Sequence, residues 1–171
     1  NRDDFPILNR PFDGRELIYL DSAATTQKPQ AVIDAVGQTY AASYANANRG
    51  AHALSGHASR LVEQARTRVR RFLNAPRGYE VVFTRSTTDA LNLVAQGLAA
   101  ELGPGDEVLL SVAEHHANLL PWLRLQETRG CRLRYLEIDG QGLFDPDELE
   151  RLISPRSRIL TLTHVSNVLG A

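Results

Sequence analysis

The chain has 171 residues, of which 43% are hydrophobic and 23% are charged, and its formal net charge is −1. A balance this close to neutral argues against nucleic acid or an anionic membrane as a main partner, and no apolar run has the length of a membrane span. The single cysteine excludes an internal disulfide and fits a reducing, cytoplasmic setting.

The first part of the chain predicts a short strand, two helices and a loop between them. Residues 17–20 have the apolar character of a strand, and Pro29 suits the first turn of a helix. Residues 43–56 are small and polar and predict a loop. The second helix is amphipathic, and the near-neutral charge favours a solvated arginine face over a nucleic-acid surface. The apolar stripes predicted to be buried are Val32, Val36 and Tyr40 on the first helix, and Leu61, Ala65, Val69 and Phe72 on the second.

Beyond residue 79, apolar strand patterns alternate with helical patterns. This alternation predicts an α/β domain with a largely parallel sheet. Ligands of such sheets bind beyond the carboxyl ends of the strands. The expected strands are 80–84, 106–112, 132–138 and 158–165, and the expected helices are 88–101, 117–129 and 146–153.

The segment TRSTTD follows the first of these strands. A helix start has unpaired N–H groups and a partial positive charge, so Thr87 and Thr88 are candidates for binding a phosphate. Ser86 or Thr87 as a helix cap, with Asp89 completing a capping box, explains the same residues without a ligand, and is the stronger interpretation of this segment alone. The absence of a glycine-rich Walker pattern argues against a nucleoside triphosphate site.

The segment EHHAN places His115 and His116 at the end of another strand. Imidazoles bind metals, stack on flat rings or transfer protons. Adjacent side chains on an extended segment point in opposite directions, so one metal held by both is unfavourable, and no other cluster has zinc-like spacing. Stacking or proton transfer is the functional hypothesis, and a local hydrogen bond made by one histidine is the structural alternative.

The segment THVSNVLGA follows the last strand and contains His164, Ser166 and Asn167. An asparagine amide can orient an oxygen on a bound ring. An ordinary turn ending at Gly170 is the alternative, and it is favoured for this segment alone. A phosphate-binding helix start, an imidazole and an amide at one sheet edge together suit a phosphorylated aromatic cofactor.

Five segments resemble, in order and spacing, the SufS-type cysteine desulfurases, which are pyridoxal 5′-phosphate (PLP) enzymes of the class V aminotransferase group. They are YLDSAATTQKP, NRGAHALS, VVFTRSTTDALNLVA, SVAEHHANLLPW and ILTLTHVSNVLGA, and the likeness covers essentially the whole chain. It implies an α/β, type I PLP-dependent transferase fold. Residues 1–56 would form an N-terminal arm, helix and substrate-side loop, and residues 57–171 part of the large PLP-binding domain. The family is dimeric, so the resemblance implies a homodimer with its active site near the subunit interface.

The resemblance also implies roles for the residues at the predicted sheet edge. Thr87 and Thr88 would bind the cofactor phosphate. His115 would stack on the pyridine ring and assist proton transfer. Asn167 would hydrogen-bond the ring-side oxygen or the substrate.

Four further residues would lie near the substrate: Ala23, Ala24, Asn48 and Arg49. The family usually has histidine in an H-R-G motif where this chain has Asn48 followed by Arg49. Because an asparagine does not titrate near neutral pH, an acid–base role is lost at this position.

The implied reaction converts L-cysteine to L-alanine and passes the sulfur, as an enzyme-bound persulfide, to a sulfur-acceptor protein for iron–sulfur cluster assembly. Such enzymes need a lysine that bonds to the cofactor, an aspartate at the pyridine nitrogen and a cysteine nucleophile, all downstream of the matched segments. Lys28 and Cys131 do not match these positions, and we interpret them as a surface lysine and a structural cysteine. We therefore expect this chain to be the inactive N-terminal part of an enzyme roughly twice as long.

Two other hypotheses stay open. Another class V reaction, such as that of a selenocysteine lyase, an epimerase or a kynureninase-like enzyme, is compatible with Asn48. A noncatalytic α/β fragment that binds only a phosphate compound or a partner is compatible with the missing lysine.

Overall fold

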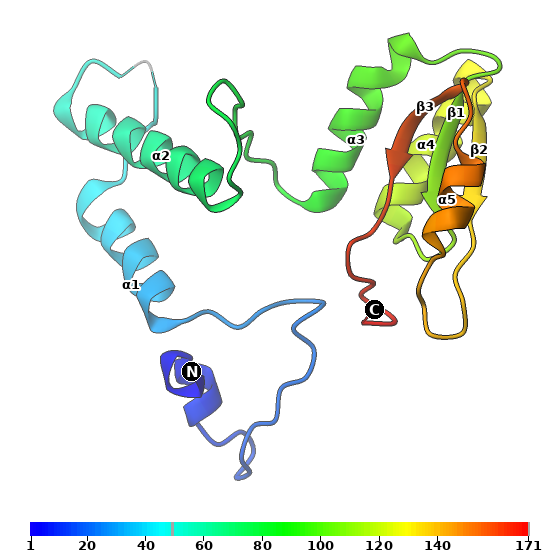
Figure 1. Cartoon of the computed structure of the whole chain (residues 1–171). Coiled ribbons are helices and arrows are strands. Elements are labelled where there is room, and N and C mark those ends of the chain that lie inside the picture. The colour runs from blue at the N-terminus through cyan, green and yellow to red at the C-terminus, as the bar shows by residue number, and fades with distance from the viewer. Residues whose placement is uncertain (49, 171) are drawn as a thin grey trace. The chain divides into compact units, whose positions relative to one another are not determined.

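The computed structural model describes residues 1–48 and 50–170 and divides into two compact units, Asn1–Val82 and Phe83–Ala171 (Figure 1). The predicted boundary after residue 56 concerns the domains of a longer protein and stays a prediction. Within the described ranges, none of the helices combines the length and the apolar character needed to cross a lipid bilayer.

The first unit is built from helices and turns. Pro29 occupies the N-cap of the first long helix, close to the predicted start. The second long helix begins inside the predicted loop 43–56, because His52 caps it: His52 Nδ1 accepts the Ser55 N–H at 3.2 Å. The elements are η1 (Arg2–Asp4), η2 (Pro6–Asn9), α1 (Gln30–Gln38), the π-helical η3 (Thr39–Ser43) and α2 (Ala53–Phe72).

The apolar stripes of α1 and α2, predicted to be buried, are largely exposed. Val36 is 51% exposed and Phe72 is 87% exposed. A helix buries its apolar face only against a second packed layer, and the described part of the first unit contains no sheet. The prediction that these stripes are buried is therefore wrong for this structure.

Two predicted strands, residues 17–20 and 80–84, do not form. A strand depends on backbone pairing with a neighbour, and no described strand pairs with either segment. Side chains instead donate hydrogen bonds to backbone carbonyls of both segments. The Arg2 guanidinium donates to a carbonyl of the first segment at 3.0 Å, and the Arg66 guanidinium donates to a carbonyl of the second.

The second unit alternates helices and strands in the predicted order. Its elements are α3 (Thr87–Leu98), η4 (Ala99–Glu101), β1 (Glu107–Ser111), α4 (His116–Arg129), β2 (Arg132–Leu136), α5 (Pro146–Leu152) and β3 (Ser157–Thr161). The strands form one parallel sheet in the order β2-β1-β3, which confirms the α/β class and the parallel sheet. β3 ends at Thr161 rather than at Val165, because the Thr163 N–H bonds to the Glu114 side chain instead of to a strand.

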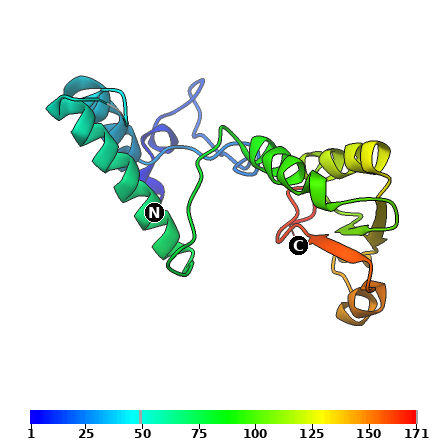
Figure 2. The same cartoon turned by 90° about the horizontal axis from the view of Figure 1, so that it is seen from above.

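The sheet topology places helices on both faces and brings the strand ends together. The connection from β1 to β2 and the connection from β2 to β3 cross the sheet in opposite directions. Right-handed crossovers therefore place α4 and α5 on opposite faces. Figure 2 shows α3 and α4 on one side of the strands and α5 on the other. The three carboxyl ends meet at one edge.

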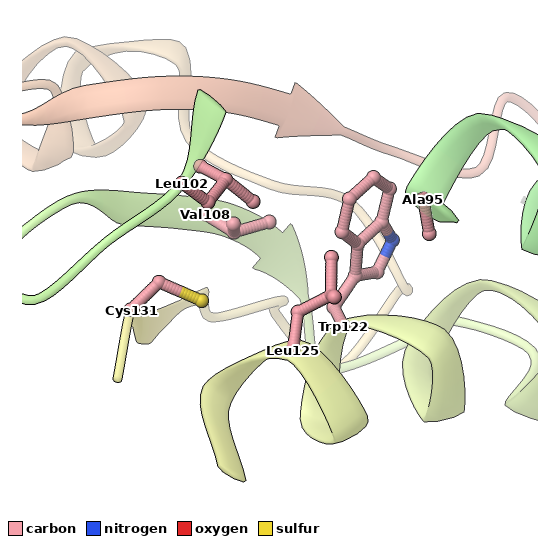
Figure 3. Close-up of a cluster of buried hydrophobic side chains, with 6 residues drawn as sticks. All are labelled: Ala95, Leu102, Val108, Trp122, Leu125 and Cys131. Atoms are coloured by element: carbon pink, nitrogen blue, oxygen red, sulfur yellow. The ribbon is translucent and has the colours of Figure 1, made fainter. Parts of the chain in front are cut away.

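The hydrophobic core lies between β1 and the helices α3 and α4 (Figure 3). Trp122 is 1% exposed and is its largest member. Cys131 is equally buried, and this burial raises the pKa of its thiol. A raised pKa disfavours the reactive thiolate, which is consistent with the interpretation of Cys131 as a structural cysteine. The cluster consists of Ala95, Leu102, Val108, Trp122, Leu125 and Cys131.

Candidate cofactor-binding site

α3 begins directly in the segment TRSTTD. Ser86 caps the helix: its Oγ accepts the Asp89 N–H at 3.2 Å. Asp89 Oδ2 in turn accepts the Arg85 N–H at 3.3 Å. This arrangement resembles a capping box and confirms the structural interpretation of the segment, with Ser86 as the cap.

The two threonines after the cap have donors available for a ligand. Thr87 and Thr88 are exposed first-turn residues, and neither hydroxyl bonds to another described residue. The first-turn N–H groups and the positive end of the helix dipole favour an anion here. The cap and the phosphate interpretations are therefore compatible, because the cap uses the Ser86 side chain and leaves both threonine hydroxyls available.

His115 is the N-cap of α4. Its Nδ1 accepts the Ala117 N–H at 3.0 Å, which confirms that one histidine makes a local hydrogen bond. A neutral imidazole that accepts at Nδ1 carries its proton on Nε2. The cap thus fixes the tautomer and orientation of an exposed ring and leaves Nε2–H as a donor.

His116 is the first residue of α4 and is also exposed. Its ring centroid lies 6.3 Å from that of His115, and the ring planes are tilted by 51°. In the part of the chain that the structure describes, no group of three or more metal-binding side chains occurs.

A pocket of about 340 Å³ lies at the carboxyl edge of the sheet, and His115 and Asn167 both line it. The structure therefore brings these two predicted site residues together. Ser166 Oγ is buried and accepts two N–H groups of the following residues, each at 3.2 Å, and Gly170 has φ 72°. This confirms the predicted turn, on which Asn167 is exposed. Apolar wall residues of the pocket are Val112, Ile138, Val168 and Leu169.

Thr87 and Thr88 do not line this pocket. Figure 1 shows, however, that α3 begins at the end of the second unit toward which the strand arrows point. The predicted phosphate donors and the pocket thus lie at the same end of this unit. An apolar pocket with a few polar groups is the ordinary form of a small-molecule site.

Two polar residues at the pocket, Glu114 in its lining and Asn118 behind it, were not assigned roles from the sequence. The Glu114 carboxylate accepts hydrogen bonds from Ser111, the last residue of β1, and from the segment after β3, and Asn118 connects it to Trp122. Residues 114, 118 and 122 are four apart, which is about one helical turn at each step. This spacing is the sequence signal that could have predicted contacts among their side chains. The hydrogen bond from the Thr163 N–H to Glu114 joins residues that are far apart in the sequence, so no local spacing pattern predicts it.

The substrate-side residues belong to the first unit. Ala23 and Ala24 are exposed in a turn braced by the Tyr19 hydroxyl, which donates to the Thr25 carbonyl at 2.6 Å. Their predicted proximity to the substrate stays a prediction.

Asn48 is exposed and has φ 66°, a left-handed conformation that asparagine tolerates well. Its N–H donates to Ser59 Oγ at 2.8 Å. A side chain at Gly50 would collide with Ser55, so the backbone approaches α2 closely here. Arg49 lies outside the described residues.

Comparison with known proteins identifies the family. The model of the family described as aminotransferase class-V matches residues 18–171. A probable cysteine desulfurase of Pseudomonas aeruginosa is 48% identical over 169 residues, which are 99% of this chain and 42% of that protein. The chain therefore spans less than half the length of the curated relatives it matches.

Solved structures agree with this result. The apo cysteine desulfurase of Thermococcus onnurineus NA1 superimposes with a TM-score of 0.89 at 38% identity, over 99% of this chain and 40% of that one. The Escherichia coli cysteine desulfurase CsdA gives 0.82 at 45% identity, over 99% and 42%. The second unit's parallel α/β sheet is therefore part of the fold of these enzymes. The chain belongs to the class V aminotransferase family.

Proposed function

We propose that this chain is the cofactor-binding N-terminal part of a cysteine desulfurase, which converts L-cysteine to L-alanine and retains the sulfur as an enzyme-bound persulfide. The observation that carries the proposal is the pocket at the carboxyl edge of the sheet, lined by His115 and Asn167. The relatives that match 99% of the chain are called cysteine desulfurases.

The cofactor of this family is PLP, and the second unit offers groups that suit its phosphate, its ring and its oxygen substituent. Thr87 and Thr88 offer hydroxyls and first-turn N–H groups for the phosphate. The apolar walls and the His115 ring suit the pyridine ring, and the Asn167 amide suits its oxygen substituent. When bound, PLP supplies an electron sink for bonds broken at the substrate carbon.

His115 has two tasks in this proposal. It stacks on the cofactor ring, and it moves a proton at Nε2. The hydrogen bond from the Ala117 N–H to Nδ1 supports both tasks, because it holds the ring in one orientation and in one tautomer.

The substrate side is assigned to residues of the first unit. Ala23, Ala24, Asn48 and Arg49 would contact L-cysteine. The left-handed backbone at Asn48 supports a structural reason for the asparagine, since this conformation favours a short polar side chain. We propose that Asn48 orients the substrate without exchanging a proton.

The remaining parts of the proposal concern the longer protein. It would act as a homodimer in the cytoplasm, and it would pass its persulfide to a sulfur-acceptor protein for iron–sulfur cluster assembly, as SufS-type enzymes do. The single buried cysteine of this chain supports the assignment of the sulfur-accepting cysteine to another segment.

The test is product formation by the longer protein, purified with PLP and assayed with L-cysteine and a reductant. We expect sulfide and alanine in equal amounts. The variant His115→Ala should reduce turnover and shift the absorption of bound PLP, whereas His57→Ala, which changes an exposed histidine of α2, should do neither.

The products distinguish the alternatives. PLP binding without sulfide release, together with alanine release from selenocysteine, would move the function to a selenocysteine lyase and make Asn48 the first residue to examine. A protein that binds no PLP would contradict the proposal as a whole.

A further inference from the structure

The Glu114 carboxylate is the meeting point of three hydrogen bonds from three segments. Oε1 accepts the Ser111 hydroxyl at 2.9 Å and the Thr163 N–H at 2.7 Å. Oε2 accepts the Asn118 side-chain amide at 2.7 Å. All three groups donate, which matches a carboxylate, because it accepts at both oxygens.

These bonds join the two loops that carry the predicted site residues. Glu114 directly precedes His115 in the β1–α4 loop. Thr163 lies in the segment after β3, four residues before Asn167. Glu114 itself lines the pocket shared by His115 and Asn167. The bond between Oε1 and the Thr163 N–H is therefore a direct tie between the imidazole side and the amide side of the pocket.

The tie is anchored in the core. Asn118 is 8% exposed, and its Oδ1 accepts the Trp122 indole N–H at 3.2 Å and the Thr161 hydroxyl at 2.9 Å. Among the described residues, no buried side-chain polar atom lacks a hydrogen-bond partner. A fully satisfied network of this kind is rigid and specifies one arrangement.

We propose that Glu114 is a positioning residue that sets the spacing between the His115 ring and the Asn167 amide around the cofactor ring. The proposal rests on the proposed function. A glutamine keeps the shape of Glu114 but has one accepting oxygen and one donating nitrogen, so it cannot accept from both the Thr163 N–H and the Asn118 amide. Glu114→Gln therefore loses one of these two hydrogen bonds and leaves the Thr163 N–H with at most an uncharged, weaker acceptor, with little change in volume.

The experiment uses the PLP-loaded longer protein and compares Glu114→Gln with Glu127→Gln, a control on α4 that removes the same charge from an exposed side chain. The first readout is hydrogen exchange of the amides at 162–167. We expect roughly tenfold faster exchange in Glu114→Gln, in line with the loss of a charge-assisted hydrogen bond, and wild-type exchange in Glu127→Gln.

The second readout is the circular dichroism of bound PLP, which reports the asymmetry of the groups around the ring. We expect a changed band in Glu114→Gln and an unchanged one in the control. Wild-type exchange and a wild-type band in Glu114→Gln would overturn the proposal. Wild-type protein without bound PLP would contradict the proposed function instead, while the exchange data would still test the tie.

A conservative variant covers the case in which Glu114→Gln does not fold. Glu114→Asp keeps the charge but shortens the side chain, so its carboxylate cannot reach all three donors from the same backbone position. We expect intermediate exchange rates and a partly changed PLP band. A Glu114→Asp protein identical to wild type in both readouts would overturn the proposal.

Discussion

The two units differ in what their apolar side chains pack against. In the second unit, β1 is buried along its whole length and packs with Trp122 and Leu125 of α4. In the first unit, helices of comparable amphipathic pattern leave Val36 and Phe72 largely exposed. All buried hydrophobic side chains of the described residues belong to the second unit. Apolar periodicity therefore predicts which face of a helix is apolar, but a sheet or a second helix layer decides whether that face is buried.

The largest expected effect comes from the core of the second unit. Trp122→Ala should lower the free energy of unfolding by about 3–5 kcal/mol, because it leaves a cavity beneath β1. Phe72→Ala, at the 87% exposed end of α2, should change it by less than about 0.5 kcal/mol. Urea unfolding of the longer protein measures both. Equal losses of stability in the two variants would show that the first unit's apolar stripe is buried in solution. This result would contradict the difference in burial between the two units.

The next effect comes from the polar network beside the pocket. Asn118→Asp replaces a donor to Glu114 with a second carboxylate at a site that is 8% exposed. We expect a loss of about 2–3 kcal/mol from the broken bond and the buried charge. Asn46→Asp makes the same change at an exposed site of the first unit and should be close to neutral. A neutral Asn118→Asp in the same unfolding experiment would show that the network is absent in solution.

The smallest effect is on acid stability and concerns the opposite edge of the sheet. The Ser154 hydroxyl, with help from Arg134, lowers the pKa of Glu107 below its usual 4.5, and the Arg158 guanidinium lowers that of Asp106. A carboxyl with a lower pKa in the folded protein contributes stability above its unfolded value and loses it as the pH falls through its folded value. Unfolding free energy should therefore decline below pH 4.5.

Glu107→Gln should make this decline shallower. Glu63→Gln should not, because the ion pair of Glu63 with Arg66 is exposed and such pairs contribute little. Stability measured between pH 3 and pH 6, a range set by the usual carboxyl pKa values, checks both variants. Equal slopes in wild type and Glu107→Gln would contradict the role of this carboxylate.

The sequence predicted the second unit better than the first for a physical reason. Its strands and helices alternate along the chain, and right-handed crossovers then determine which ends meet, so His115 and Asn167 were expected at one edge. The predictions of strands at 17–20 and 80–84 were wrong because strand formation depends on pairing with a neighbour that is distant in the sequence. The Glu114 tie was missed for the same reason, since Thr163 lies far along the chain from β1.

The central claim is that the carboxyl edge of this sheet binds PLP, with its phosphate at the start of α3. The most direct measurement is the PLP dissociation constant of the longer protein in wild type, Thr88→Val and the control Thr128→Val, which removes an exposed hydroxyl on α4. We predict a dissociation constant at least about tenfold higher for Thr88→Val, since a charge-assisted hydrogen bond is lost, and no change for the control. Equal affinities in all three proteins would contradict the assignment of the phosphate site.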